Sequence, residues 1–177
     1  MNGIQQAVDK ISDFLESDEK GLLLTGTHQY KKHKLVMSIL NTSYRNAHIL
    51  FRTNAMGNIT NNSFIGIPCQ PRPGQHVRIN GNIYEFDAFT PKNTWYATAK
   101  QFDFAIVYPI DGMCSDSKYG PIEYLTEYKK IGKMLLCSWT DRLDYDYSEL
   151  RAFYSRHVVY DAEEEDPEYH DRVLSCL

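Results

Sequence analysis

Cysteine is sparse and dispersed in this sequence. The four cysteines form no Cys-x-x-Cys pair, and the six histidines are equally scattered. Secreted domains that depend on disulfides are shorter and much richer in cysteine. We therefore expect reduced thiols, as in a cytoplasmic protein, and no zinc site built from cysteine and histidine. The cysteines are Cys69, Cys114, Cys137 and Cys176.

Long apolar runs and an excess of positive charge are also missing. No apolar stretch is long enough to span a bilayer, and the polar N-terminal segment lacks the apolar core of a secretory signal. The formal net charge is -4, so overall charge does not favour nucleic acid as a partner. We expect a cytoplasmic protein without a membrane anchor.

The composition is that of one globular domain. Hydrophobic residues make up 42% and charged residues 24% of the 177 residues, which are ordinary values. A chain of this length can bury a sizeable core in a single domain, so we expect residues 1–177 to form one unit.

The first fifty residues alternate between helical and strand patterns. Apolar residues spaced three and four apart predict an amphipathic helix over 3–17 and a second helix over 33–43. The short apolar run at 22–24 is typical of a strand buried on both faces. Residues 48–52 are expected to form the next strand.

The middle of the chain is irregular and then forms a hairpin. Residues 53–74 are rich in asparagine and proline, with a short strand expected at 64–67. The Asn80-Gly81 pair between two apolar stretches predicts a tight hairpin turn. We expect this hairpin, over about 75–89, to be an insertion between parallel strands.

Strands and helices alternate again in the last part of the chain. The pattern predicts an α/β three-layer sandwich with a mostly parallel sheet of about five strands, plus the hairpin. An acidic run at 161–166 is expected to be a solvated loop that leads into a helix. The expected strands are 102–110, 133–139 and 157–160, and the expected helices are 121–131, 148–154 and 167–174.

One segment, residues 21–40, resembles the phosphate-binding region of P-loop NTPases. Its sequence GLLLTGTHQYKKHKLVMSIL contains a buried strand, a glycine turn and a helix that opens with lysine. The family pattern is glycine, four residues, then glycine-lysine-serine or threonine. Gly26 matches the first glycine and Lys32 matches the phosphate-binding lysine. The helix at 3–17 and the charged turn after it also resemble the entry to RecA-like domains.

The departures from that pattern affect the residues that hold phosphate and magnesium. Lys31 replaces the second glycine, where a side chain crowds the N–H groups that bind phosphate. His33 replaces the hydroxyl residue that holds Mg²⁺. The resemblance implies the fold and a site for ATP, another nucleotide or phosphate around Gly26, Thr27, Lys31, Lys32 and His33, without ordinary Mg²⁺-dependent hydrolysis. The alternative is a lysine-rich turn with no ligand, which many doubly wound proteins have.

An acidic residue could complete such a site. Asp111 follows the strand expected at 102–110, as in the Walker B strand of the same family, and ligands of open α/β sheets bind at the carboxyl ends of strands. The alternative is that Asp111 begins an Asp111-Gly112 turn. Thr140 and Asp141 end the next strand and would face the same edge, although both are also natural turn or helix-entry residues.

A metal-dependent nuclease is the sharpest enzymatic alternative. Such folds place an aspartate and a Glu-x-Lys pair around a metal ion. Asp111 with Glu127 and Lys129 supplies the residue types, but 127–129 is expected in a helix. A second set, Glu85 with Asp87, lacks a well-placed lysine. The sequence has no Gly-x-Ser-x-Gly turn and no Gly-x-Gly-x-x-Gly fingerprint.

Three functions therefore remain open. The leading one is a degenerate P-loop-like domain that binds a nucleotide, another phosphate ligand or a protein partner and does not hydrolyse NTP. The second is an enzyme, such as a nuclease, that uses the carboxyl edge of the sheet. The third is a pure protein-interaction module that uses the 53–74 loop and the hairpin as its contact surface.

Overall fold

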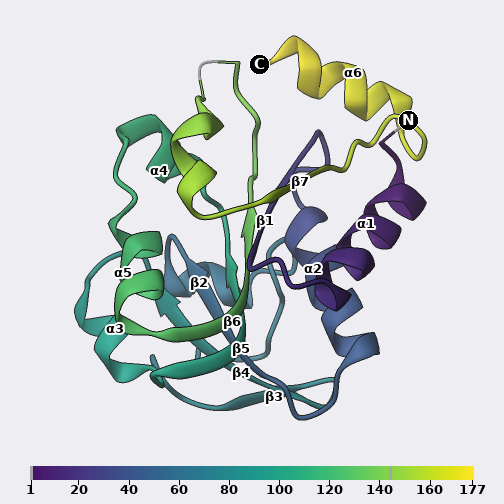
Figure 1. Cartoon of the computed structure of the whole chain (residues 1–177). Helices are drawn as coiled ribbons and strands as arrows, with labels where there is room; N and C mark the ends of the chain where they lie inside the picture. The colour runs from purple at the N-terminus through teal and green to yellow at the C-terminus, as the bar shows by residue number, and fades with distance from the viewer. Residues whose placement is uncertain (1, 144) are drawn as a thin grey trace.

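A computed structural model describes residues 2–143 and 145–177, apart from the side chain of residue 116. The fold is an α/β three-layer sandwich, in which helices flank a central sheet (Figure 1). The strand order is β3-β4-β2-β5-β6-β1-β7, and every neighbouring pair is parallel except β3 with β4. This confirms the predicted fold class. The strands are β1 (Gly21–Thr25), β2 (His48–Thr53), β3 (Val77–Ile79), β4 (Asn82–Ala88), β5 (Gln101–Val107), β6 (Lys130–Cys137) and β7 (Arg156–Val159).

Helices cover both faces of the sheet. Figure 1 shows α1 and α2 on one side and α3, α4 and α5 on the other. No helix in the described part of the chain is both long and apolar enough to cross a membrane. The helices are α1 (Ile4–Glu16), α2 (Lys32–Ser43), α3 (Asn93–Ala97), α4 (Asp111–Asp116), α5 (Gly120–Tyr128) and α6 (Pro167–Ser175), with 3₁₀ turns η1 (Met56–Thr60) and η2 (Tyr147–Ala152).

Side-chain alternation along the strands builds one core on each face. In β1, Leu22 and Leu24 join the core that includes Phe14 of α1, whereas Leu23 joins the core that includes Leu125 of α5. All three β1 leucines have no exposed surface. A continuous apolar run is what a parallel strand covered on both faces requires, which explains why 22–24 was recognisable as a strand.

The carboxyl ends of β1, β6 and β5 meet at one edge of the sheet. These strands are adjacent and parallel, with Leu24 opposite Cys137 and Leu136 opposite Val107. The turn after β1 therefore lies beside the segments that follow β5 and β6. This topology brings together polar residues that are far apart in the sequence.

The hairpin is inserted in the sequence between the parallel strands β2 and β5, as predicted, and it extends the main sheet at its edge. Its turn residues Asn80 and Gly81 have φ of +47° and +89°, which confirms the tight turn. Residues 83–88 of β4 pair in parallel with the whole of β2, and β3 lies antiparallel at the sheet edge. The two strands of the hairpin join five others, so the sheet has seven strands.

Residues 64–67 form a turn, so the short strand expected there is wrong. The N–H groups of Gly66 and Ile67 donate to the carbonyl of Ile59, at 3.0 and 3.3 Å. These bonds tie the loop to η1, which uses the donors that a strand would offer to a neighbour.

The helix expected over 121–131 ends at Tyr128. Lys129 is extended (φ -123°, ψ 152°), and its ammonium group donates to the carbonyls of Thr98 and Ala99 at 3.2 and 2.6 Å. This tertiary contact draws the chain out of the helix, so β6 begins at Lys130.

Candidate functional site

The turn after β1 is shaped by close packing of two backbone segments. Gly26 has φ of +118°, a conformation that favours glycine. A Cβ atom at this position would lie 2.2 Å from the carbonyl oxygen of Tyr160, just after β7. The backbone at Tyr160 therefore requires a glycine at position 26, independently of any phosphate.

Two carboxylates accept the first N–H groups of the turn. The N–H of Gly26 donates to Asp141, and the N–H of Thr27 donates to Asp161 Oδ1 at 3.0 Å. In an anion-binding turn, successive N–H groups of this kind face the ligand. Here the protein's own acids, one after β6 and one after β7, occupy those donors.

The rest of the turn is also bonded to protein atoms. The N–H of Gln29 donates to the hydroxyl of Tyr169 at 3.2 Å. The hydroxyl of Thr27 lies 2.8 Å from His170 Nδ1 and accepts the N–H of Ala162 at 2.9 Å. The segment after β7 and helix α6 thus cover the turn. The N–H groups of Gly26, Thr27 and Gln29 are bonded to protein atoms and are not free to bind an anion.

Lys32 lies under the turn and does not project into solvent. It is fully buried at the start of α2. Its ammonium group donates to the carbonyls of Gly26 and Trp139 and lies 4.0 Å from Asp141 Oδ2. Burial lowers the pKa of Lys32, whereas the charges of Asp141 and Asp111 act to raise it. The lysine that matches the phosphate-binding position therefore ties two loops together.

Lys31 does not crowd the N–H groups as the sequence suggested. Its exposed side chain points to Glu165, with the two charged atoms 2.8 Å apart. The neighbouring Lys34 donates to the carbonyl of Asn62 at 2.6 Å. The obstruction of the turn thus comes from the two aspartates.

His33 packs in the core as an aromatic side chain. Its ring stacks on Tyr108 with centroids 3.9 Å apart, and its Nε2 lies 2.5 Å from the carbonyl of Phe64. Burial lowers the pKa of His33 to about 4, so the ring is neutral at pH 7 and Nε2 is the donor. It takes no part in holding an anion at the turn.

Asp111 fastens the end of β6 to the end of β5. It begins α4, so the expected Asp111-Gly112 turn is the first turn of a helix. Both carboxylate oxygens are occupied, since they accept the N–H groups of Trp139 and Thr140 at 2.6 Å each. Burial raises the pKa of Asp111 to about 6, against the effect of these bonds and of Lys32.

Of the residues expected at the site, Gly26, Thr27, Lys32 and Asp111 lie together at the carboxyl edge, whereas Lys31 and His33 point away. Asp141, also expected at this edge, is central to the cluster. Asp161 was not predicted at the site, because it begins an acidic run that is typical of a solvated loop. The signal that could have indicated its role is that an aspartate directly follows the strand expected at 157–160.

A cavity lies at the same edge of the sheet, where the chain leaves the neighbouring strands β2 and β5 toward opposite faces of the sheet. After β2 it turns to the α2 side, where Ile59 joins the first core, and after β5 it enters α4 on the other side, where Met113 joins the second core. Crevices at such reversals are where open α/β sheets bind ligands. The cavity here has a volume of about 600 Å³. Its lining includes Asn54, Phe89, Lys92, Trp95, Lys118 and Tyr119.

Neither set of nuclease residues is assembled. Asp111 follows the carboxyl end of β5, whereas Lys129 precedes the amino end of the parallel strand β6, so the two lie at opposite edges. Asp87 is fully buried and is held by two hydrogen bonds from Arg52, at 2.8 and 2.6 Å. A carboxylate bound in this way is not available to a metal ion.

One group of side chains in the described part of the chain is placed to bind a metal ion. It consists of His48, His76 and Glu85 and lies at the far end of the strands from the turn. No zinc site was predicted from the sequence, because this group comes together only through the pairing of β2 with β4.

No protein-family model, no curated protein and no solved structure matches this chain. Function must therefore be inferred from the geometry of the two edges of the sheet.

Proposed function

We propose that this protein is a degenerate P-loop-like domain that binds a phosphate-bearing aromatic ligand of the nucleotide class without hydrolysing it. The ligand would bind in the crevice between the ends of β2 and β5, and not in the turn after β1. The observation that carries the proposal is the cavity of about 600 Å³ at this crevice. That volume lies within the range of small-molecule sites.

The lining of the cavity suits such a ligand. The half-buried rings of Phe89 and Tyr119 offer apolar surfaces for a planar base beside the buried Trp95, and Lys92 and Lys118 offer positive charge for phosphate oxygens. The ammonium of Lys92 lies 5.7 Å from the centre of the Trp95 ring. Aromatic and cationic groups are therefore adjacent in the wall, as a nucleotide needs.

The turn after β1 supports the absence of hydrolysis. Its first N–H groups are taken by Asp141 and Asp161, and a phosphate there would meet two negative charges. Lys32 is buried against carbonyl groups, and no hydroxyl side chain stands where the P-loop pattern holds Mg²⁺. These features favour a structural role for the turn.

Isothermal titration calorimetry with ATP, GTP and AMP, each with and without Mg²⁺, tests the proposal. We expect saturable binding that Lys92→Glu combined with Lys118→Glu reduces by at least about tenfold, because each reversal places a like charge beside phosphate. Lys10→Glu, which reverses one lysine at an exposed position of α1 away from the cavity, is the control and should bind normally. Phosphate-release assays should show no turnover. No binding, or equal loss in the control, would exclude the crevice as a nucleotide site.

A protein partner is the second candidate, favoured by an exposed aromatic cluster. Tyr96 and Tyr128 are 69% and 64% exposed, and both rings contact Tyr124, with centroids 5.8 and 5.0 Å apart. Exposed tyrosines are typical of protein interfaces. Replacing Tyr96 and Tyr128 by serine should abolish capture of such a partner and leave the nucleotide titration unchanged.

For either function we propose a cytoplasmic setting, which the four free cysteines support.

A further inference from the structure

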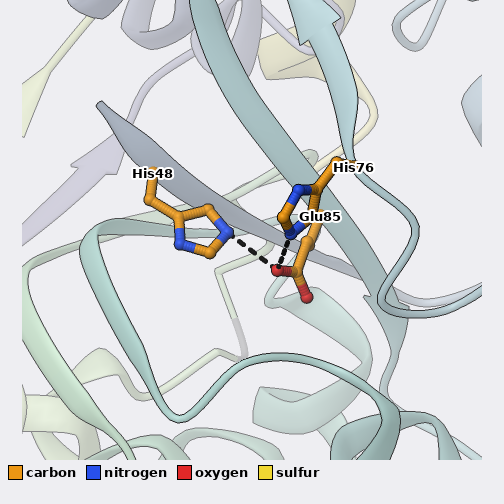
Figure 2. A group of neighbouring side chains, drawn as sticks. All are labelled: His48, His76 and Glu85. Carbon is orange, nitrogen blue, oxygen red and sulfur yellow. Dashed lines mark hydrogen bonds and ion pairs between the residues drawn. The ribbon is translucent and has the colours of Figure 1, made fainter. Parts of the chain in front are cut away.

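Three side chains with metal-binding atoms converge near the amino ends of β2 and β4. His48 begins β2, Glu85 lies within β4, and His76 precedes β3. Figure 2 shows both imidazole rings directed at the same carboxylate oxygen of Glu85. The three donor atoms lie within 4.8 Å of one another, so one ion could contact all of them.

The distances are close to those of a metal centre. His48 Nε2 lies 2.7 Å and His76 Nε2 lies 3.1 Å from Glu85 Oε1. In a tetrahedral zinc site, bonds of about 2.0–2.2 Å place neighbouring ligand atoms about 3.3 Å apart. On binding zinc, the distance from Glu85 Oε1 to His48 Nε2 would therefore increase by about 0.6 Å and that to His76 Nε2 by about 0.2 Å. Side-chain rotation can supply these changes.

The carboxylate of Glu85 is buried, and Lys129 is the positively charged lysine near it. The Glu85 side chain is 2% exposed, and its ion pairs in the described part of the chain are with the two histidines. Asp87, two residues further on, pairs with the permanent cation Arg52. The ammonium of Lys129 is engaged by Thr98 and by backbone carbonyls. A divalent ion at Oε1 would place a positive charge in direct contact with this buried carboxylate, which Lys129 does not do.

The surroundings hold the ligands in place. Glu85 Oε2 accepts the N–H of Ala99 at 3.0 Å, which fixes the carboxylate and leaves Oε1 for the ion. The ring of His48 packs on Phe102, with centroids 4.5 Å apart. Such supporting contacts orient metal ligands and raise affinity.

We propose that His48, His76 and Glu85 bind a divalent transition metal ion, with Zn²⁺ the expected ion. Two imidazoles and one carboxylate suit zinc, whereas Mg²⁺ and Ca²⁺ prefer oxygen ligands alone. The side chain of His76 is 64% exposed, so the ion can enter from solvent and keep water as its fourth ligand. Each Nε2 that now donates to Glu85 would bind the metal through its lone pair, with the ring proton held on Nδ1. The ion would also clamp the hairpin edge to β2.

Titration of the full chain with Zn²⁺ and with Co²⁺ tests this site. We expect one ion per chain, a rise in Tm with Zn²⁺, and a cobalt spectrum without thiolate charge-transfer bands. Long-range ¹H–¹⁵N spectra should show the ring nitrogens of His48 and His76 shifting on Zn²⁺ addition, with the other four histidines unchanged. His76→Gln keeps a hydrogen-bond donor to Glu85 at an exposed position but lacks an imidazole, so it should fold normally and lose affinity by at least about tenfold.

His157→Gln is the matched control, because it removes an exposed histidine on β7. This variant should bind Zn²⁺ as the wild type does. The proposal is overturned if the wild type binds no Zn²⁺, if His76→Gln binds as tightly as the wild type, or if the cobalt spectrum shows thiolate ligation, which would point to the exposed Cys69 or Cys176.

Discussion

Replacing Asp141 by asparagine should weaken the fold around the turn after β1. The substitution keeps the size of the side chain and removes its charge. Asp141 lies 4.0 Å from the buried ammonium of Lys32, accepts the N–H of Gly26 and accepts the hydroxyl of Tyr147 at 2.9 Å. The variant therefore removes an internal anion from beside a buried cation.

The magnitude follows from these contacts. At 4.0 Å and an effective dielectric constant of about 20, the Coulomb energy of the pair is about 4 kcal/mol. Loss of charge assistance to the Gly26 bond adds about 1 kcal/mol. Asp111 remains as a second acid near Lys32, and the amide can still bond, so part of this is recovered. We expect the free energy of unfolding to fall by about 3 kcal/mol.

Urea denaturation in chloride and in phosphate buffer of equal ionic strength measures this loss. Phosphate should affect wild type and variant equally, because the amide fills the position of the carboxylate and can still accept the Gly26 N–H, and Lys32 stays buried. Asp146→Asn is the matched control, because Asp146 caps η2 and asparagine caps as well as aspartate. A loss below about 1 kcal/mol would refute the idea that the charge of Asp141 stabilises the buried ammonium of Lys32.

Two further predictions concern the same edge of the sheet. Gly26→Ala should destabilise the protein by several kcal/mol in urea denaturation, because its Cβ would collide with the backbone of Tyr160; Gly112→Ala in α4, where a Cβ meets nothing within 4 Å, should be neutral or stabilising by up to about 1 kcal/mol. Equal effects of the two changes would contradict the packing explanation. Burial raises the pKa of Asp111 from 3.8 to about 6 in the folded protein, so the folded state holds its proton more tightly than the unfolded chain. The protonated carboxyl therefore contributes stability below pH 4, and roughly 3 kcal/mol of the free energy of unfolding is lost as the pH rises to about 6. The stability difference between wild type and Asp111→Asn, measured from pH 4 to pH 7, should change by this amount in favour of the variant, and a flat or opposite profile would show that the carboxylate is stabilised in its charged form.

Local patterns were sufficient to predict most helices and strands. The leucine run of β1 and the Asn80-Gly81 turn carry strong signals in a few adjacent residues, and both are confirmed by the structure. Predictions were weakest where a distant contact decides the backbone, as at Lys129, whose helix is ended by carbonyl groups on another segment. Periodicity within a window cannot register such a contact.

The candidate sites were harder to predict because their residues are distant in sequence. Gly26 and Lys32 were found from the spacing of one motif, but their partners Asp141 and Asp161 follow other strands and meet the turn only through the sheet order. The same holds for Glu85, which reaches His48 because β4 pairs with β2. A glycine and a lysine at matching positions indicated a P-loop-like turn, whereas their actual partners are the protein's own carboxylates and carbonyls.

Fluorescence of Trp95 tests most directly whether the crevice, and not the turn after β1, is the ligand site. The chain has two tryptophans, so Trp139→Phe leaves Trp95, in the cavity wall, as the only reporter. We predict that ATP quenches this fluorescence saturably, that adding Lys92→Glu with Lys118→Glu abolishes the quenching, and that adding Lys31→Glu at the turn leaves it intact. Quenching that survives the crevice reversals but is lost with Lys31→Glu would contradict the proposed site and place the ligand at the turn.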